Sequence, residues 1–217
     1  MKYLFSSMLL LVFYTNSFAQ IGLIAQYHSQ SAPVYYAKID KPNEENIQLA
    51  GGGIDYTFRL KNYRVEFFPA LVYLNGSSKY PDENTLGENT LNLTTLGIQF
   101  NTHFYLFDIE GDCHCPTWSK DGDFLKKGFY LSLSLNGYNT MFKEEGIPDI
   151  NLYYGALAIG LGIDIGLAKK ITLTPSLQYE LQQRKTISPG FISLENKQNT
   201  VSNLILGLRL GYSFKDH

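Results

Sequence analysis

The densest group of side chains that could do chemistry in this 217-residue chain is the CHCP motif that begins at Cys113. Two thiolates and an imidazole are ligands that zinc accepts, and the carboxylates of Asp108 and Asp112 are close in sequence. Structural zinc usually takes four ligands, with at least two residues between paired cysteines, so the C-x-C spacing fits poorly. We therefore predict no metal site. A disulfide between Cys113 and Cys115 and a turn packed by two cysteines both stay open, although an i,i+2 bridge is geometrically tight.

The elements that must position any functional side chain are strands. Residues 151–167, NLYYGALAIGLGIDIGL, carry long aliphatic side chains at most odd positions and mainly small side chains at even positions. This period of two predicts a strand whose two faces meet different environments. The small face has too little volume for a packed core, and the aliphatic face is longer than an average soluble strand. The pattern is typical of an outer-membrane barrel, with aliphatic side chains toward lipid and small or polar ones toward the lumen.

Seven further segments alternate in the same way. Pro69 and Pro175 interrupt two of these segments, and because proline cannot donate to a strand ladder, we expect a bulge or a strand end near each. Long and short connections mostly alternate along the chain, as they do in bacterial barrels. The sequence predicts one all-β domain, a closed antiparallel eight-stranded transmembrane β-barrel. The predicted strands are 21–28, 47–60, 63–75, 91–107, 128–142, 151–167, 171–183 and 201–214.

The first nineteen residues are typical of a secretory signal peptide. Lys2 precedes a short apolar run, and Ser17-Phe18-Ala19 is a small-x-small cleavage site before Gln20. We therefore expect a signal peptide over 1–19 and the barrel domain over 20–217. Short turns of bacterial barrels are periplasmic and long loops are outside. This predicts the outer membrane of a Gram-negative bacterium, with both termini periplasmic; the long connection 108–127 is the exception.

Composition excludes several other classes of protein. Charged residues make up 18% of the chain, against about 25% in soluble domains. A formal net charge of −2 provides no basic surface for nucleic acid. The mean hydropathy of −0.14 excludes a polytopic helical membrane protein, whereas a barrel dilutes its apolar residues by alternation. A soluble ligand-binding barrel would have a polar outer face. The polar face here is instead rich in Gly, Ala and Ser, which favours a narrow lumen.

Charged side chains of both signs occupy inward positions of the predicted strands. An eight-stranded barrel is only wide enough for its own side chains to fill, and an unpaired buried charge costs several kcal/mol. We therefore predict a salt-bridged plug that blocks conduction, in which Arg209 meets Asp55, Glu66 or Asp164. A narrow selective channel is the alternative. The predicted network comprises Asp55, Arg59, Arg64, Glu66, Asp164, Glu180 and Arg209.

The signal peptide, the eight alternating strands and the closing GLRLGYSF of residues 207–214 resemble small Gram-negative outer-membrane barrels. These include the OmpA transmembrane domain, OmpX-like proteins and the "outer membrane protein beta-barrel domain" group. The resemblance covers the mature chain. It implies that the last strand, with Phe214, is presented to the barrel assembly machinery, although three residues follow Phe214. Outer-membrane lipid and lipopolysaccharide are the expected surroundings.

The same resemblance raises the question of enzymatic activity, because some of these barrels are acyltransferases or deacylases that use Ser and His. The candidates here are His103, Ser132 and Ser134. Their alternation places all three in the lumen, whereas lipid chemistry needs a site open to the outer leaflet. We therefore predict no catalytic residue and no cofactor. The predicted role is structural, or contact with a surface protein or lipopolysaccharide through loops 29–46 and 184–200. A lipid-modifying enzyme is the alternative.

Overall fold

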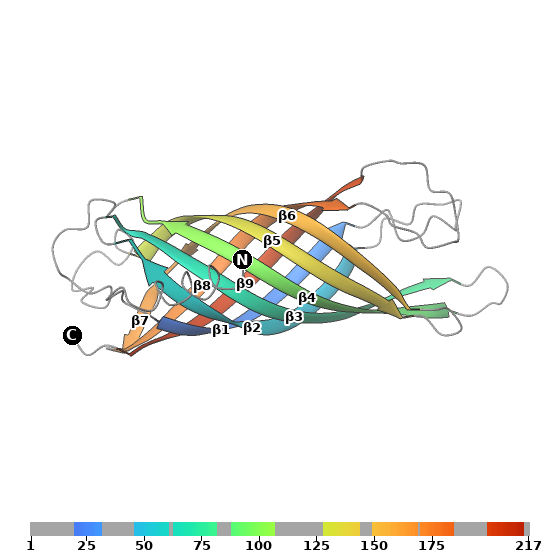
Figure 1. Ribbon diagram of the computed structural model, residues 1–217. Coiled ribbons are helices and arrows are strands. Elements are labelled where there is room, and N and C mark those ends of the chain that lie inside the picture. The colour runs from blue at the N-terminus through green and yellow to red at the C-terminus, as the bar shows by residue number, and fades with distance from the viewer. Residues whose placement is uncertain are drawn as a thin grey trace, which may run out of the picture.

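The protein folds into one antiparallel sheet that closes on itself (Figure 1). The computed structural model describes residues 20–31, 46–60, 63–81, 88–106, 128–143, 149–168, 170–184 and 199–214. The signal peptide, the CHCP motif and most of the predicted loop residues lie outside these ranges. The strands are β1 (Gln20–Ser31), β2 (Asn46–Arg59), β3 (Val65–Pro81), β4 (Glu88–Phe104), β5 (Phe129–Lys143), β6 (Ile150–Ile163), β7 (Ile165–Ala168), β8 (Ile171–Arg184) and β9 (Asn199–Ser213).

The nine strands make an eight-stranded barrel because β6 and β7 are two parts of one strand. The order is β6-β5-β4-β3-β2-β1-β9-β8-β7, and β6 also pairs with β8, which closes the cylinder. Gly162 of β6 pairs with Ser176, and Ile165 of β7 pairs with Leu173 in the same register. Only Asp164 separates the two parts. The predicted fold class, a closed antiparallel eight-stranded β-barrel, is confirmed.

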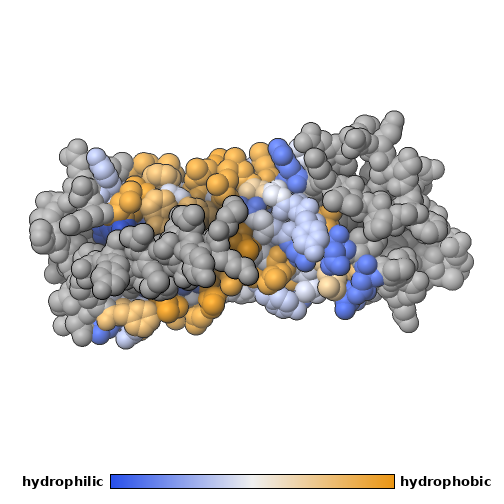
Figure 2. Space-filling view, viewed as in Figure 1, coloured by the Kyte–Doolittle hydropathy of each residue, from blue (hydrophilic) through white to orange (hydrophobic). Residues whose placement is uncertain are grey.

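Side-chain alternation gives the barrel an apolar outside. Ile159 and Leu135 are each 60% exposed, whereas the adjacent Ala158 and Ser134 are buried in the lumen. Large aliphatic and aromatic side chains are exposed on the outer face of all eight barrel strands. On the face seen in Figure 2, they form an orange band across the described part of the barrel. Such a surface has the arrangement expected of strands that face lipid.

Within the described ranges, no helix combines the length and the apolar character that a membrane crossing requires.

The apolar band does not extend over the whole barrel. We call the end at which Gln20 pairs with Ser213 the terminus end, and the opposite end the loop end. Toward the loop end, outward side chains such as Asn75 and Asn151 are exposed and polar. Figure 2 shows the orange band giving way to blue and white residues in that direction. Exposed tyrosines, whose rings suit a membrane–water boundary, occur on five of the strands. They are Tyr27, Tyr73, Tyr153, Tyr179 and Tyr212.

The β3–β4 hairpin is longer than the sequence predicts. Residues 76–90 are expected as a polar loop, but β3 continues to Pro81 and β4 begins at Glu88. Their register is unbroken from Gly76 opposite Leu93 to Pro81 opposite Glu88. Alternation could not reveal this part, because it lies beyond the apolar band, where the sequence is mainly polar at odd and even positions alike.

Neither β3 nor β8 ends or bulges at its proline, so that expectation is wrong for these two strands. Pro69 lies opposite Phe100 and Pro175 lies opposite Leu208, each in regular register. The irregularity lies instead in the pairing of each strand with its other neighbour, β2 for β3 and β6–β7 for β8. Pairs between β2 and β3 are missing beside Pro69, and Asp164 breaks the strand that faces Pro175. A proline lacks a single N–H, so only one of its two ladders has to be disturbed.

Candidate functional site in the barrel lumen

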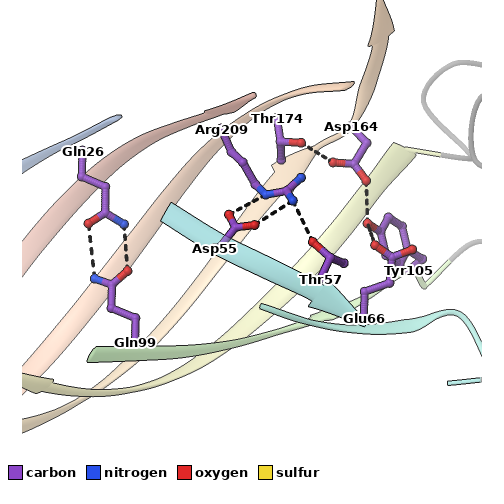
Figure 3. Close-up of polar contacts among 9 residues, drawn as sticks. All are labelled: Gln26, Asp55, Thr57, Glu66, Gln99, Tyr105, Asp164, Thr174 and Arg209. Carbon is purple, nitrogen blue, oxygen red and sulfur yellow. Dashed lines mark hydrogen bonds and ion pairs between the residues drawn. The ribbon is translucent and has the colours of Figure 1, made fainter. Parts of the chain in front are cut away.

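The best-defined polar contact in the lumen is a bidentate ion pair between β9 and β2 (Figure 3). Arg209 donates from Nε to Oδ2 of Asp55 at 2.6 Å and from Nη2 to Oδ1 at 2.8 Å. The same Nη2 donates to Oγ1 of Thr57 at 2.7 Å. The Asp55 side chain is 1% exposed and that of Arg209 10%. Two parallel charge-assisted bonds fix both the position and the orientation of the guanidinium.

Two glycines, one on β1 and one on β9 itself, make room for this pair. A Cβ atom on Gly22 of β1 would lie 2.5 Å from Oδ1 of Asp55 and 2.6 Å from Nε of Arg209. A Cβ atom on Gly211 would collide with the guanidinium. On its other side, Cζ of Arg209 lies 4.9 Å from the ring centroid of Phe68. The small residues of the lumen face therefore leave space that the side chains of Asp55 and Arg209 occupy.

A second polar group lies near the terminus end and is centred on Tyr105, which follows β4. Its hydroxyl lies 2.5 Å from Oδ2 of Asp164 and 3.2 Å from Oε2 of Glu66. Thr174 donates from Oγ1 to Oδ1 of Asp164 at 2.6 Å, and Cζ of Arg64 lies 4.4 Å from the Tyr105 ring centroid. Figure 3 shows the hydroxyl between the two carboxylates. Because Tyr105 lies within the predicted strand 91–107, its parity with His103 could have revealed it.

The seven charged residues expected in the lumen therefore fall into separate groups. Asp55 binds Arg209, while Glu66, Asp164 and Arg64 surround Tyr105. Arg59 is half-buried and lies opposite Glu66 in the β2–β3 register.

Glu180 is set apart from these groups. It is completely buried on β8, and no Arg or Lys of the described ranges forms an ion pair with it. Four neutral donors satisfy its carboxylate instead. They are Asn136 Nδ2 at 2.6 Å, Gln182 Nε2 at 2.8 Å, Tyr138 OH at 2.9 Å and Asn203 Nδ2 at 2.9 Å.

Glu180 belongs to a closed ring of hydrogen bonds that the charge pattern alone did not predict. Asn203 lies 2.9 Å from Nδ1 of His28, and Nε2 of His28 lies 3.2 Å from Oε1 of Gln26. Gln26 and Gln99 exchange amide hydrogen bonds, which Figure 3 shows as a reciprocal pair. Gln99 then donates to Tyr138, which donates to Glu180. We call this set of six residues, contributed by five strands, the polar ring.

The lumen candidates for catalysis do not form a catalytic arrangement. His103 stacks between two rings, with centroids 4.1 Å from Phe68 and 3.8 Å from Tyr130. Ser132 lies opposite His103 in register, but neither its Oγ nor His103 Nδ1 makes a hydrogen bond within the described residues. Ser134 donates to Asn101. A nucleophile needs a base within hydrogen-bond reach, which in turn is held by a third group. The described ranges also hold no cluster of three or more His, Cys, Asp or Glu suited to a metal ion.

Side chains fill the lumen at other levels too. A cavity of about 40 Å³ remains beside His103 and Arg209, which is room for a few water molecules. Near the loop end several inward positions are apolar, contrary to the expected polar lumen. This apolar cluster consists of Ile47, Leu49, Leu74, Leu91, Leu93 and Phe142.

Comparison with known proteins identifies the fold. No family model and no curated protein matches the sequence. Neisserial surface protein A is similar in structure, with a TM-score of 0.50 and 12% identity over 90% of this chain and 97% of that one. Ail of Yersinia pestis, in complex with the heparin analogue sucrose octasulfate, has a TM-score of 0.46 and 11% identity over 91% and 99%. The N-terminal barrel domain of Pseudomonas aeruginosa OprF has a TM-score of 0.34 and 17% identity over 88% and 97%.

At such identities the likeness concerns the fold. It agrees with the resemblance found in the sequence: the chain has the fold of the small outer-membrane β-barrels of Gram-negative bacteria.

Proposed function

We propose that the protein is a non-enzymatic barrel of a Gram-negative outer membrane, with a lumen plugged by its own side chains and a structural or surface-interaction role. The main support for this proposal is the contrast between the outer face and the lumen face of the barrel. Outside, an apolar band with exposed tyrosines suits lipid. Inside, the Arg209–Asp55 pair, the Tyr105 group, the polar ring and the apolar cluster follow one another along the barrel.

The plug is favoured over a channel because the lumen groups bind one another. Gln26 of β1 and Gln99 of β4 exchange hydrogen bonds although two strands lie between them, and the His28 ring of β1 lies 6.5 Å from the Tyr138 ring of β5 on the opposite side of the barrel. Such contacts cross the lumen rather than line a water-filled path. Eight strands enclose a space that side chains can fill completely.

Planar-bilayer recording tests the plug. The wild-type protein should give no stable open-channel conductance, because its lumen is packed at several levels. A double variant, Gln26→Ala with Gln99→Ala, serves as a comparison because it removes the reciprocal amide pair from the lumen. A porin reconstituted in the same bilayer verifies that the bilayer accepts barrels. A steady, ohmic conductance step from the wild-type protein would refute the plug. Turnover of labelled lipid A or phospholipid by the purified protein would refute the non-enzymatic role.

The orientation proposed for the barrel has both termini in the periplasm and the loop end outside. It rests on the alternation of connection lengths and on the polar outer surface near the loop end. Intact cells offer a test with an impermeant thiol reagent. One variant replaces both native cysteines, Cys113→Ser and Cys115→Ser, and adds Ser77→Cys at an exposed position near the loop end. This variant should be labelled from outside. The native cysteines, after reduction, should react only once the outer membrane is permeabilised; the reverse pattern would invert the barrel.

Three kinds of partner fit this placement. Lipid surrounds the apolar band, lipopolysaccharide or a surface protein would meet the loop end, and the assembly machinery would bind the last strand. Tyr212 and Phe214 support the last of these, because both rings are exposed on the outer face with centroids 5.4 Å apart.

A further inference from the structure

A pocket of about 380 Å³ opens in the barrel wall between β6 and β8. Its volume lies within the range of ligand pockets, about 300–1,000 Å³. Leu161 and Leu177 line it and are also part of the exposed apolar band, at 46% and 39% exposed. Phe129, Ile163 and Pro175 complete its apolar lining. We call it the wall pocket.

The wall pocket exists because the strand ladder is interrupted at this point. Gly162 pairs with Ser176, and Ile165 of β7 pairs with Leu173, but Ile163 between them pairs with Phe129 of β5 and has no register partner on β8. Pro175 has no N–H to give, and the N–H of Asp164 donates to the carbonyl of Gly128 at 2.9 Å. With these rungs absent, the two strands are joined only above and below the gap.

Tyr130 closes the gap on the lumen side. A Cβ atom on Gly162 would collide with the Tyr130 hydroxyl and would lie 2.9 Å from the carbonyl oxygen of Pro175. The Tyr130 side chain therefore lies directly behind the wall, and it is itself buried. A chain entering from the apolar band would contact apolar side chains and end against this ring, without passing into the lumen.

We propose that the wall pocket binds one acyl chain of a phospholipid from the periplasmic leaflet. This inference rests on the proposed outer-membrane placement with periplasmic termini. The pocket is continuous with the lipid-facing band, so a hydrocarbon chain is the ligand already in contact with it. It also lies near the terminus end, since Phe129 begins β5 and Pro175 is the fifth residue of β8. That level belongs to the periplasmic leaflet, which makes the ligand a phospholipid rather than lipopolysaccharide. An acyl chain held in the wall pocket would make dispersion contacts with the side chains that line it. Those side chains lack such contacts when the pocket is empty.

Tryptophan quenching by brominated lipid can test the pocket. All variants carry Trp118→Phe, which removes the single native tryptophan. Phe129→Trp places a reporter in the pocket lining. Phe104→Trp is the matched control, since Phe104 is exposed near the same end of the neighbouring strand β4 and does not line the pocket. Both are reconstituted in phosphatidylcholine vesicles with increasing mole fractions of phosphatidylcholine brominated on one acyl chain.

A bound chain should make Phe129→Trp reach half-maximal quenching at a bromolipid fraction about threefold lower than Phe104→Trp, a modest preference in affinity. Coincident curves would overturn the acyl-chain site while leaving the barrel in the membrane. Absence of quenching at both positions would instead refute the membrane placement.

A second variant ties the binding to the interrupted ladder. Pro175→Ala supplies the missing N–H and allows β8 to approach β6. On the Phe129→Trp background it should move the quenching curve to that of the Phe104→Trp control. An unchanged curve would place the lipid preference elsewhere and overturn the assignment to the wall pocket.

Discussion

Arg209→Met should destabilise the folded barrel by about 3–5 kcal/mol, the usual cost of breaking a buried ion pair by removing one partner. The substitution leaves the Asp55 carboxylate in the lumen with its side chain 1% exposed and both strong donors gone. Adding Asp55→Asn removes that stranded charge, so the double variant should recover much of the lost stability. The free energy of unfolding from urea titrations in lipid vesicles measures both effects.

Glu66 provides the matched control for this pair. Its carboxylate is buried in the lumen and accepts a hydrogen bond from the Tyr105 hydroxyl. Among the described residues, Arg209 donates to Asp55 and Thr57 rather than to Glu66. Arg209→Met combined with Glu66→Gln should therefore remain at least as unstable as Arg209→Met alone. Recovery with Glu66→Gln but not with Asp55→Asn would contradict the pairing described here.

Ile159→Arg should cost about 2–4 kcal/mol, the range for a cation on the lipid face near the bilayer midplane. Ile159 is 60% exposed within the apolar band, and it is outside the wall pocket lining. Asn151→Arg tests the same change on the same strand, beyond the tyrosine at position 153, and should stay within about 0.5 kcal/mol of wild type. The measurement is the free energy of unfolding in vesicles. Equal costs at the two positions would contradict the proposed lipid boundary.

The sequence predicts most of the wall because a lipid-facing strand imposes a period of two. Beyond the lipid-facing band the period of two is no longer required, and the sequence does not reveal the structure there. The polar extension of the β3–β4 hairpin, 76–81 with 88–90, shows no apolar face, although its backbone pairs regularly. The inward residues of the loop end show the opposite case. Leu49 and Leu93 have the parity of lumen residues, yet the expectation of a polar lumen gave no reason to pack them together.

The lumen contacts depend on how the strands are staggered, which a single sequence does not contain. Parity alone left three carboxylates as partners for Arg209, and the fold brings it to Asp55. Glu180 was expected among charges, but the register brings Asn136 and Asn203 to it instead. The small residues of 151–167 also look interchangeable in sequence. In three dimensions Gly162 faces Tyr130, where even one added carbon would collide.

The Arg209–Asp55 pair has a consequence for how the cylinder comes together. β9 and β2 lie on either side of β1, and the two side chains meet above Gly22 of that strand. The seam between the first and last strands is what turns a curled sheet into a closed tube. Because 154 residues separate the partners, neither has the other nearby while this seam is open. The pair thus acts as an internal latch: it engages only on closure, and its energy opposes reopening of the seam rather than the loss of any single hairpin.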